Sequence, residues 1–456
     1  MELHKDNLPG KSVTVLGAQR SGIAAAKLLK QAGAQPFLSD TDAESLSHEQ
    51  KDELKILEIG YETGEHTKRV YLSDLVVISP GIPDSAEVVK ECTRRKITLI
   101  SEIELASWFV TAPVLAITGS NGKTTTTSLV AEFLNNTDFQ SVLCGNVGNS
   151  FAGVVSSTSP DPEDRIYVVE VSSFQLERVP TFKPYISVIL NITPDHLDRY
   201  PSFEAYRLAK LNITGNQVDS DYFVCNADDP QLRDVQTNAR KITFSTTTSE
   251  VSGDFTWNGE TILFQNDPFI PFADCTLRGK HNLANILAGL NATTPLINPI
   301  NQHRMLEHFS QVLRSFTGIE HRLEFVKTVN GVDYYNDSKA TNIDAVKYAI
   351  ESFSHPVILI LGGYDKNGDF TQLIPGIRQC VKQTIAIGKA REVIRKALEN
   401  KVELTLCEDL EEAVDFAASI ANQDDVVLLS PACASFDQYN NYEERGKHFK
   451  SLVNAL

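Results

Sequence analysis

A glycine-rich stretch between an apolar run and a helical pattern constrains the fold of this chain more than any other feature. The sequence TGSNGKTTTT, residues 118–127, follows the strand-like run PVLAI and precedes SLVAEFL, whose apolar spacing is helical. Glycines allow backbone N–H groups to approach an anion closely, and the N-terminal end of the following helix adds positive potential. The order of strand, glycine loop and helix therefore predicts a phosphate-binding element at the edge of a parallel sheet.

This loop has the chemistry of an ATP-binding loop in a shortened form, because Ile117 stands where the first glycine of such a loop is usual. Lys123 can reach the β- and γ-phosphates as a point charge, and Thr124 can place its hydroxyl on Mg²⁺. The residues expected to contact the nucleotide are Gly119, Ser120, Asn121, Gly122, Lys123, Thr124 and Thr125. The loop alone leaves open whether the terminal phosphoryl group is transferred to water, to a protein or to a small substrate.

Strand-like and helix-like runs alternate along almost all of the 456 residues, which predicts an α/β protein with mostly parallel sheets. At about 150 residues per domain, a chain of this length favours about three domains. We expect a Rossmann-like N-terminal domain over residues 1–101, a central P-loop ATPase-like domain over 102–317 and a C-terminal Rossmann-like domain over 318–456. The last should begin with a hairpin in LEFVKTVNGVDYYNDS that turns at Asn330 and Gly331.

Composition and charge exclude several classes of protein. The chain carries 42 Lys and Arg against 59 Asp and Glu, a net charge of −17, which disfavours nucleic acid as a partner. No run of about 18 apolar residues occurs, so no membrane span is expected, and the N-terminal stretch lacks the apolar core of a signal peptide. The 7 cysteines are scattered without a C-x-x-C pair, which favours free thiols over a zinc site or disulfides. We therefore expect a cytoplasmic protein.

Three further polar side chains are placed to meet the phosphate loop at one edge of the same sheet. Glu170 ends the apolar strand RIYVVE, His196 follows the next strand, and Lys210 lies one turn after Tyr206 on one face of the helix beyond. An acid beside such a loop can hold Mg²⁺, although Glu170 by itself is equally compatible with a structural role. Because Mg²⁺ normally takes oxygen ligands, a histidine ligand needs support from elsewhere in the chain.

With these residues in view, the chain resembles the Mur ligase family over essentially its whole length. The resemblance is carried by ITGSNGKTTTT, GNVG, EVSSFQLE, LNITPDHLDRY, AKLNI, GKHNLANILAG, GIEHRLE, NDSKATN and LLSPACASFDQYNNYEERG. Of these, SSFQLE, NDSKATN and PACASFDQ are similar to the members that add D-glutamate. The resemblance implies that ATP phosphorylates the carboxylate of UDP-N-acetylmuramoyl-L-alanine, and that the amine of D-glutamate attacks the acyl phosphate. ADP, phosphate and a peptidoglycan precursor would be the products, and we expect the enzyme to act as a monomer.

The resemblance also implies roles for the residues around the loop. Lys123 would hold the ATP phosphates, and Thr124 and Glu170 would share one Mg²⁺. His196 and Lys210 would serve a second Mg²⁺ near the acyl phosphate. Lys210 matches the lysine that the family carbamylates, a reaction that requires an unprotonated amine and therefore a depressed pKa. The expected catalytic residues are thus Lys123, His196 and Lys210.

The same resemblance implies which residues contact each of the three substrates. Adenine would contact Asn282 and Asn285, and Arg322 and Asp337 would close over phosphate and ribose. The implied contacts of the muramoyl-alanine part are Asn146, Ser172 and Gln175. Those of D-glutamate are Lys339, Thr341, Ser435, Phe436 and Tyr442, with Lys366 helping to close the site. A dicarboxylate needs a cation together with hydroxyl or backbone donors, which this set contains. The segment NDSKATN is equally suited to cap a helix, and it can do both.

The first domain carries a degenerate dinucleotide fingerprint. In VLGAQRSGIAAAKLL, Gly17 and Gly22 have the spacing of that fingerprint, but Gln19 replaces its middle glycine, so it is weak as a sign of NAD binding. By resemblance the domain binds the UDP part instead, with the diphosphate near Arg20 and Ser21 and uracil near Asp40 and Thr41. The loop GAQRSG departs from the commoner GLGxSG of the family, and Asp42 stands where some members carry a basic residue.

Three other functions compete with D-glutamate addition. A ligase that adds L-alanine, a diamino acid or a folate glutamate is disfavoured by SSFQLE and PACASFDQ, and no DNPR-like phrase of the diamino-acid type is present. A nicotinamide oxidoreductase with two Rossmann-like domains would leave the phosphate loop unexplained. A nucleotide-binding scaffold without catalysis is disfavoured because Lys123, Glu170, His196, Lys210 and Lys339 are all present.

Overall fold

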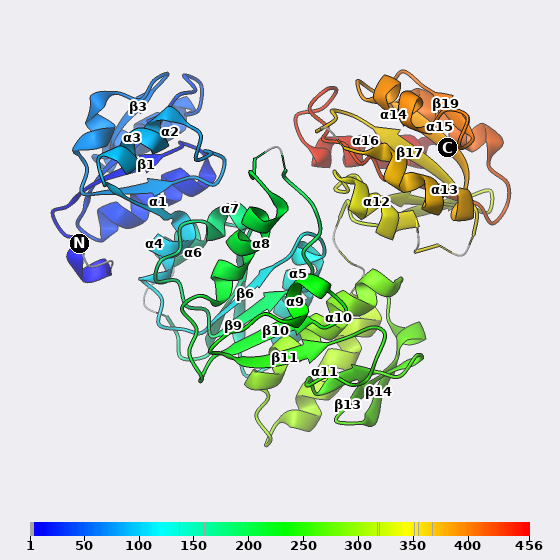
Figure 1. Ribbon diagram of the computed structural model, residues 1–456, viewed down its shortest axis with the longest axis horizontal. Helices are drawn as coiled ribbons and strands as arrows, with labels where there is room; N and C mark the ends of the chain where they lie inside the picture. The colour runs from blue at the N-terminus through cyan, green and yellow to red at the C-terminus, as the bar shows by residue number, and fades with distance from the viewer. Residues whose placement is uncertain are drawn as a thin grey trace. The chain divides into compact units, whose positions relative to one another are not determined.

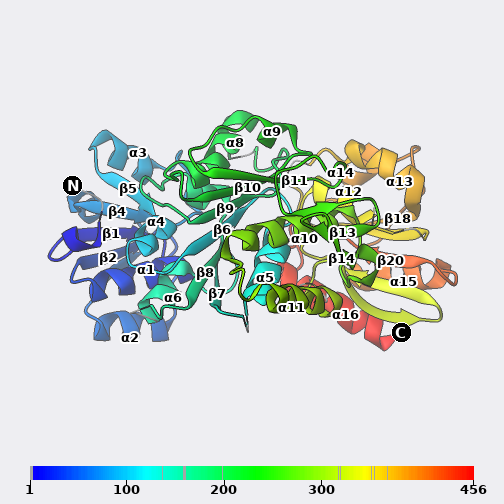
Figure 2. The same ribbon diagram turned by 90° about the horizontal axis from the view of Figure 1, so that it is seen from below.

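The computed structural model describes residues 4–135, 137–157, 161–197, 199–316, 318, 320–350, 352–353, 355–366 and 368–456. The chain divides into two compact units, whose helices and strands are labelled in Figures 1 and 2. The first unit comprises Met1–Phe269 and Ala284–Ser310, and the second comprises Ile270–Leu283 and Gln311–Leu456. The division into three domains stays a prediction, and its boundary at residue 317 lies outside the described residues.

The first unit begins with a five-stranded parallel sheet in the order β3-β2-β1-β4-β5. Its strands are β1 (Ser12–Leu16), β2 (Gln35–Asp40), β3 (Gly60–Thr63), β4 (Leu75–Ile78) and β5 (Thr98–Ser101). The helices that connect them are α1 (Arg20–Gln31), α2 (His48–Ile56) and α3 (Glu87–Arg94). Alternate residues of the strands pack into two separate apolar clusters, one with α1 and α2 and the other with α3. The sheet is therefore covered on both faces, as the Rossmann-like prediction requires.

A second parallel sheet in this unit has the order β11-β10-β9-β6-β8-β7. Its strands are β6 (Val114–Thr118), β7 (Gln140–Gly145), β8 (Arg165–Glu170), β9 (Ile186–Ile189), β10 (Tyr222–Asn226) and β11 (Arg240–Phe244). The associated helices are α4 (Glu102–Ser107), α5 (Lys123–Leu134), α6 (Phe151–Ser157), α7 (Ser173–Leu176), α8 (Phe203–Leu211) and α9 (Pro230–Arg233). Strand β6 is flanked by β8 and β9, so whatever follows these three strands meets at one edge.

Two central strands of this sheet, β6 and β9, are buried along their whole length, because a parallel sheet is covered by helices on both faces. The apolar core of the second sheet is continuous with that of the first sheet through α1, α4 and α6. A small three-stranded sheet follows, made of β12 (Phe255–Trp257), β13 (Thr261–Phe264) and β14 (Asp267–Pro271). Helices α10 (Lys280–Thr293) and α11 (Gln302–Ser315) come next in the sequence.

The sheet of the second unit has the order β15-β16-β20-β17-β18-β19. Its strands are β15 (Glu324–Val329), β16 (Val332–Asn336), β17 (Val357–Gly362), β18 (Val381–Ile387), β19 (Leu404–Leu406) and β20 (Val426–Leu429). Strands β15 and β16 are antiparallel, and the other neighbours are parallel. Asn330 and Gly331 have φ of 53° and 81° at the turn, which confirms the predicted hairpin.

Helices cover both faces of this last sheet (Figure 1). They are α12 (Ile343–Ile350), α13 (Ile374–Cys380), α14 (Arg391–Leu398), α15 (Leu410–Ile420) and α16 (Tyr442–Ala455). The residues of β17 alternate between the two faces: Leu359 and Leu361 pack with α12, α13 and α14, whereas Ile358 and Ile360 pack with α15 and α16. The second unit is thus doubly wound, as its strand and helix pattern predicts.

Within the described residues, none of the helices is both long and apolar enough to cross a membrane. All seven cysteines are free, and only Cys380 is not fully buried.

Candidate functional site

The glycine loop connects the end of β6 to the start of α5, and its two glycines are required by space. Gly122 caps the helix with a φ of 85°, and a Cβ added there would lie 2.2 Å from Oδ1 of Asn285. A Cβ on Gly119 would lie 3.0 Å from Cβ of Leu190. A side chain at Gly122 would therefore meet both an unfavourable backbone conformation and an occupied space. The loop keeps a bare backbone at the beginning of a helix, which is the geometry that binds phosphate.

Lys123 stands directly over this backbone. Its Nζ atom donates hydrogen bonds to the carbonyl oxygens of Gly119, at 2.8 Å, and Ser120, at 2.9 Å. These contacts hold the ammonium group at the mouth of the loop, where it can meet an incoming phosphate as a point charge. The Nδ2 atom of Asn121, in the same loop, is buried and has no hydrogen-bond partner among the described residues. A donor left in this state is suited to an acceptor such as a phosphate oxygen.

The loop is fixed from outside by three residues that the sequence reasoning did not assign to the site. Asn191, just after β9, accepts from the N–H of Asn121 at 2.8 Å and donates to its carbonyl oxygen at 3.1 Å. The hydroxyl of Ser120 lies 2.9 Å from that of Tyr206 and donates to the carbonyl oxygen of Thr193 at 3.0 Å. The only sequence signal for Asn191 is its place after a strand that neighbours β6.

Glu170 has the properties expected of a metal ligand. It is 1% exposed at the end of β8, and its Oε1 atom accepts a 2.7 Å hydrogen bond from the side chain of Asn146. Its Oε2 atom is buried without a hydrogen-bond partner in the described part of the chain. A carboxylate oxygen in this state needs a compensating positive group. Because Mg²⁺ prefers oxygen ligands, the carboxylate of Glu170 and the hydroxyl of Thr124 fit this ion by their chemistry.

Lys210 is completely buried, since it is 1% exposed on helix α8. Its Nζ atom donates to the carbonyl oxygen of Gly119 at 2.8 Å and lies 4.7 Å from the centre of the Tyr206 ring. Burial lowers the pKa of its amine well below the ordinary value, and the nearby ammonium of Lys123 lowers it further, against the opposing effect of Asp195 and Glu170. The sequence prediction that Tyr206 and Lys210 share one face of a helix is confirmed.

His196 lies in the loop after β9, in a left-handed backbone conformation with a φ of 55°. The centre of its ring is 4.8 Å from that of Phe174, and its Nε2 atom is 3.6 Å from Oδ2 of Asp195. Its side chain is 36% exposed, in contrast to Glu170 and Lys210. The side chain of His196 is therefore partly exposed to solvent.

Ser172 and Gln175 form a capping box at the start of α7, which gives them a structural role whatever they bind. The amide N–H of Gln175 donates to Oγ of Ser172 at 3.3 Å, and the N–H of Ser172 donates to Oε1 of Gln175 at 2.9 Å. Gln175 also lines a small pocket in the first unit together with Ser79, Phe174 and Arg199. The side chain of Asn146 donates to Glu170. All three residues predicted to contact muramoyl-alanine, Asn146, Ser172 and Gln175, lie in the first unit.

The glycine turn of the first sheet is held by Asp40. Its two carboxylate oxygens accept from the N–H groups of Ala18, at 2.6 Å, and Asp42, at 2.9 Å. A Cβ on Gly22 would lie 1.8 Å from the carbonyl oxygen of Gly17, so the turn and the helix pack too closely for any other residue. Arg20 and Ser21 begin α1, and no side chain caps this helix. Thr41 follows Asp40 at the end of β2.

In the second unit, Arg322 and Asp337 lie at one end of the sheet. Asp337 is 5% exposed and accepts from the hydroxyl of Ser430 at 2.7 Å and from the N–H of Leu323 at 3.2 Å. Burial raises the pKa of its carboxyl to about 7, although the Ser430 hydrogen bond and the charge of Arg322 oppose this shift. The Nε atom of Arg322 is buried without a hydrogen-bond partner among the described residues, which suits it to an anion.

The residues predicted to hold D-glutamate follow β16 and β20 of the same sheet. Lys339 lies after β16, and its Nζ atom is 5.5 Å from the centre of the Tyr442 ring. Ser435 is 2% exposed after β20, whereas its neighbour Phe436 is 70% exposed. Thr341 follows β16, and Lys366 follows β17. Asn282 also belongs to the second unit, where its side chain donates to the carbonyl oxygen of Arg278 at 2.8 Å.

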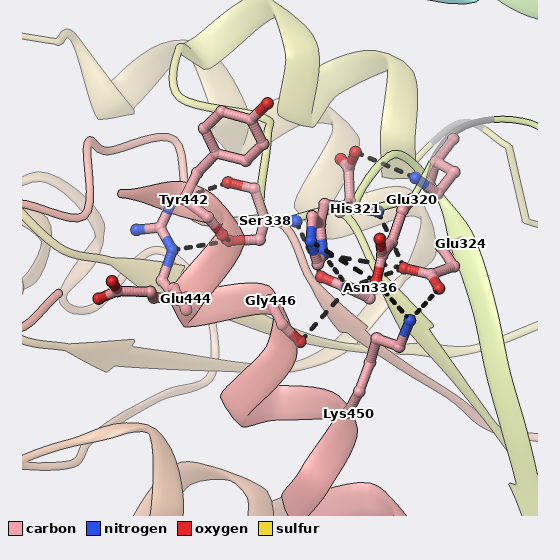
Figure 3. Close-up of polar contacts among 12 residues, drawn as sticks. Glu320, His321, Glu324, Asn336, Ser338, Tyr442, Glu444, Gly446 and Lys450 are labelled. Carbon is pink, nitrogen blue, oxygen red and sulfur yellow. Dashed lines mark hydrogen bonds and ion pairs between the residues drawn. The ribbon is translucent and has the colours of Figure 1, made fainter. Parts of the chain in front are cut away.

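A network of charges beside these residues was not predicted (Figure 3). Glu320, His321 and Glu324 form the one group of possible metal ligands found within the described residues. Lys450 already pairs with both carboxylates, at 2.9 Å from Glu320 and 2.5 Å from Glu324. Asn336 donates to Glu324 at 3.0 Å and lies 2.8 Å from Nδ1 of His321. With an ammonium group and an amide on its ligand atoms, this group is an ion-pair network rather than a metal centre.

Comparison with known domain families divides the chain into three matched parts. Residues 14–88 match the MurD N-terminal domain, 117–293 match the Mur ligase middle domain, and 321–433 match the Mur ligase glutamate ligase domain. The UDP-N-acetylmuramoylalanine--D-glutamate ligase of Salinibacter ruber is 41% identical over 471 residues, with 99% of each chain covered. The protein of the same name from Geotalea uraniireducens is 41% identical over 455 residues, with 98% of each chain covered.

Solved structures of related enzymes share the fold. The UDP-N-acetylmuramate-alanine ligase MurC from Thermotoga maritima gives a TM-score of 0.59 at 18% identity, over 98% of this chain and 99% of that one. The MurF ligase from the same organism gives 0.60 at 16% identity, over 92% of this chain and 96% of that one. At these identities the structures show the fold alone, whereas the domain matches and the 41% identical relatives show the family. The chain belongs to the Mur ligase family.

Proposed function

We propose that this chain joins D-glutamate to UDP-N-acetylmuramoyl-L-alanine with cleavage of ATP to ADP and phosphate. The observation that carries the proposal is the phosphate loop in which Lys123 and Lys210 both donate to the carbonyl oxygen of Gly119, beside the buried carboxylate of Glu170. The relatives that share this chain's full length are named for that reaction. ATP and a UDP-sugar are both made in the cytoplasm, where we place the enzyme.

The chemistry explains why cationic groups are gathered here. A carboxylate is a poor electrophile, so its oxygen must first attack the γ-phosphorus of ATP, which releases ADP and leaves an acyl phosphate. The amine nitrogen of D-glutamate then attacks the acyl carbon, phosphate leaves, and the amine loses a proton. Two anions must meet in the first step, and Lys123 offsets their repulsion at the mouth of the loop. The amine must be neutral, so a nearby base assists the second step.

Magnesium fits the oxygen atoms at this edge of the sheet. We propose that Thr124 and Glu170 hold one ion, and that His196 and Lys210 serve a second one. When bound, Mg²⁺ supplies positive charge that offsets the repulsion between phosphate and carboxylate. The unpartnered Oε2 atom of Glu170 supports the first of these sites.

Lys210 supports the second site only if it is carbamylated, because an ammonium group cannot ligate a cation. In that reaction the neutral amine attacks CO₂, a C–N bond forms, and one proton is released. Its complete burial and the nearby positive charge of Lys123 favour the neutral amine. We therefore propose that Lys210 carries a carbamate in the active enzyme.

The remaining predicted residues complete the proposal. We assign ATP to the loop, to Asn282 and Asn285, and to Arg322 and Asp337, and the UDP part to Arg20, Ser21, Asp40 and Thr41. Asn146, Ser172 and Gln175 would contact muramoyl-alanine. D-glutamate would be held by Lys339, Thr341, Ser435, Phe436 and Tyr442, with Lys366 nearby. The unpartnered Nε of Arg322 supports its assignment to a phosphate.

The test is the dependence of phosphate release on each substrate. Purified protein should release phosphate from ATP only when UDP-N-acetylmuramoyl-L-alanine and D-glutamate are both present. Release with L-alanine or a diamino acid in place of D-glutamate would contradict the proposed substrate. Lys123→Ala should abolish turnover, since it removes the charge that holds the transferred phosphoryl group, and near-normal rates in that variant would contradict the placement of ATP.

A further inference from the structure

Arg445, in the first turns of α16, is one of the most completely buried large side chains of the described chain, at 1% exposed. Its guanidinium group donates five hydrogen bonds, all to segments that follow or end strands of the sheet. Two go to Ser338 after β16, at 3.0 Å to the hydroxyl and 2.8 Å to the carbonyl oxygen. The others go to the carbonyl oxygens of Gly362 in β17, at 3.4 Å, and of Cys433 and Ala434 after β20, at 3.1 and 3.3 Å.

Every acceptor of these five hydrogen bonds is a carbonyl or a hydroxyl oxygen, and none is a carboxylate. A buried cation is costly, and here its cost is offset by several dipoles arranged around its planar fork. Burial lowers the pKa of Arg445 to about 10, so the group keeps its charge at neutral pH. A single rigid group thus connects three separate strand ends.

The surrounding backbone is shaped to admit this side chain. A Cβ on Gly363 would lie 3.0 Å from Nη1 of Arg445 and 2.3 Å from the carbonyl oxygen of Ala434, in a residue whose φ is 133°. The hydroxyl of Ser338 also donates to the carbonyl oxygen of Tyr442 at 2.8 Å, so the segment after β16 is tied to the first turn of α16 (Figure 3). Gly446, which directly follows Arg445, leaves room for the ring of His321, since a Cβ at residue 446 would lie 2.2 Å from Nδ1 of His321.

The connected segments carry the residues proposed to hold D-glutamate. Lys339 directly follows Ser338, and Ser435 directly follows Ala434. We infer that Arg445 is a positioning residue that fixes the spacing between Lys339 and Ser435, and with it the affinity for the amino-acid substrate. This inference rests on the proposed function. Arg445 itself donates to four backbone carbonyl oxygens and one hydroxyl of the protein, so its effect on the reaction passes through Lys339 and Ser435.

The experiment compares KM values of the full-length protein in the phosphate-release assay. Arg445→Lys keeps the charge but loses the planar fork, so the carbonyl oxygens at the end of β17 and after β20 cannot all be reached. We expect the KM for D-glutamate to rise by about tenfold, since a small misplacement of binding groups is costly, while the KM for UDP-N-acetylmuramoyl-L-alanine stays unchanged. The matched control is Val453→Ala, which opens a cavity in the apolar core under the same helix and removes none of the hydrogen-bond partners of Arg445. It should lower the melting temperature without changing the KM for D-glutamate.

A second variant keeps the inference testable if Arg445→Lys does not fold. Ser338→Ala removes one acceptor of the guanidinium and the tie to Tyr442, and it should raise the KM for D-glutamate by about threefold. An unchanged KM for D-glutamate in both variants, or an equal rise in Val453→Ala, would overturn the positioning role. A wild-type protein that ignores D-glutamate would instead overturn the proposed function, so the two failures are distinguishable.

Discussion

The side-chain amine of Lys210 donates a 2.8 Å hydrogen bond to the carbonyl oxygen of Gly119, inside the loop that precedes α5. The same carbonyl oxygen accepts from Lys123, also at 2.8 Å. Two ammonium groups that share one buried acceptor repel each other, so it is unfavourable for both to stay protonated. The more buried amine, that of Lys210, is the one whose pKa is lowered. The phosphate loop therefore lies between a cationic lysine and a lysine suited to react with CO₂.

Lys210→Met should separate catalysis from folding. Methionine keeps an unbranched chain of similar length without a buried amine, so we expect a turnover that falls on the order of 100-fold and a melting temperature that does not fall. Lys210→Arg keeps a cation that cannot be carbamylated and should be equally inactive. In wild-type protein supplied with ¹³C-bicarbonate, a carbamate signal should appear in the carbon NMR spectrum and be absent from both variants. A fully active Lys210→Arg would exclude the carbamate.

Gly122→Ala tests the shape of the loop. The new Cβ would lie 2.2 Å from Oδ1 of Asn285 at a φ of 85°, so the loop or helix α10 must shift. We expect the KM for ATP to rise by tenfold or more, measured by phosphate release at saturating levels of the other substrates, with a loss of about 1 kcal/mol in stability. Gly10→Ala is the matched control, since its φ of 75° imposes the same backbone strain with no atom within 4 Å of the new Cβ. An equal KM for ATP in the two variants would show that shape at Gly122 is unimportant.

The sequence predicts the strands, the glycine loop and the positions of Glu170 and Lys210 for a physical reason. Apolar runs that end in polar residues mark the edge of a parallel sheet, and the glycine loop identifies which edge binds phosphate. Ser172 and Gln175 have the spacing of a capping box, which the structure shows and which could have been recognised in the sequence. Their contact with the substrate stays a prediction.

Asn191 and Arg445 could not be identified in this way. A single asparagine after a strand carries no periodic signal, and its importance comes from both ends of its amide meeting Asn121 across two strands. Arginine is usually exposed on a helix, so its side chain would be placed in solvent by pattern alone. Only the tertiary structure shows that the strand ends surround Arg445 with carbonyl oxygens.

Glu170→Gln should weaken the dependence on magnesium rather than the fold. Glutamine can still accept from Asn146, but it carries no charge for the unpartnered Oε2 position. We expect the Mg²⁺ concentration that gives half-maximal phosphate release to rise by about tenfold or more, without a loss of stability in the absence of the ion. Glu102→Gln provides a matched control, because Glu102 is likewise buried, at 2% exposed, with an Oε2 atom that has no hydrogen-bond partner among the described residues. Equal Mg²⁺ requirements in wild type and Glu170→Gln would remove Glu170 from the metal site.

Asp337→Asn should change how stability depends on pH. Burial raises the pKa of the Asp337 carboxyl to about 7 in the folded state, whereas an aspartate in the unfolded chain titrates near pH 4. Between pH 4 and pH 7 the folded state binds one proton more than the unfolded chain does. The stabilisation of the folded state by the protonated Asp337 carboxyl is therefore complete below about pH 4 and is lost as the pH rises through 7.

Asparagine at this position cannot ionise, so the stability of the variant should not fall in this way as the pH rises. Chemical denaturation followed by circular dichroism should show little difference between the two proteins at pH 4.5, and an advantage to the variant on the order of 2 kcal/mol at pH 8. Asp369→Asn should behave in the opposite sense, because the hydrogen bond from Thr371 lowers the pKa of this exposed carboxyl and its contribution is lost as the pH falls. A constant difference between wild type and Asp337→Asn across this pH range would mean that Asp337 is already ionised in the folded enzyme.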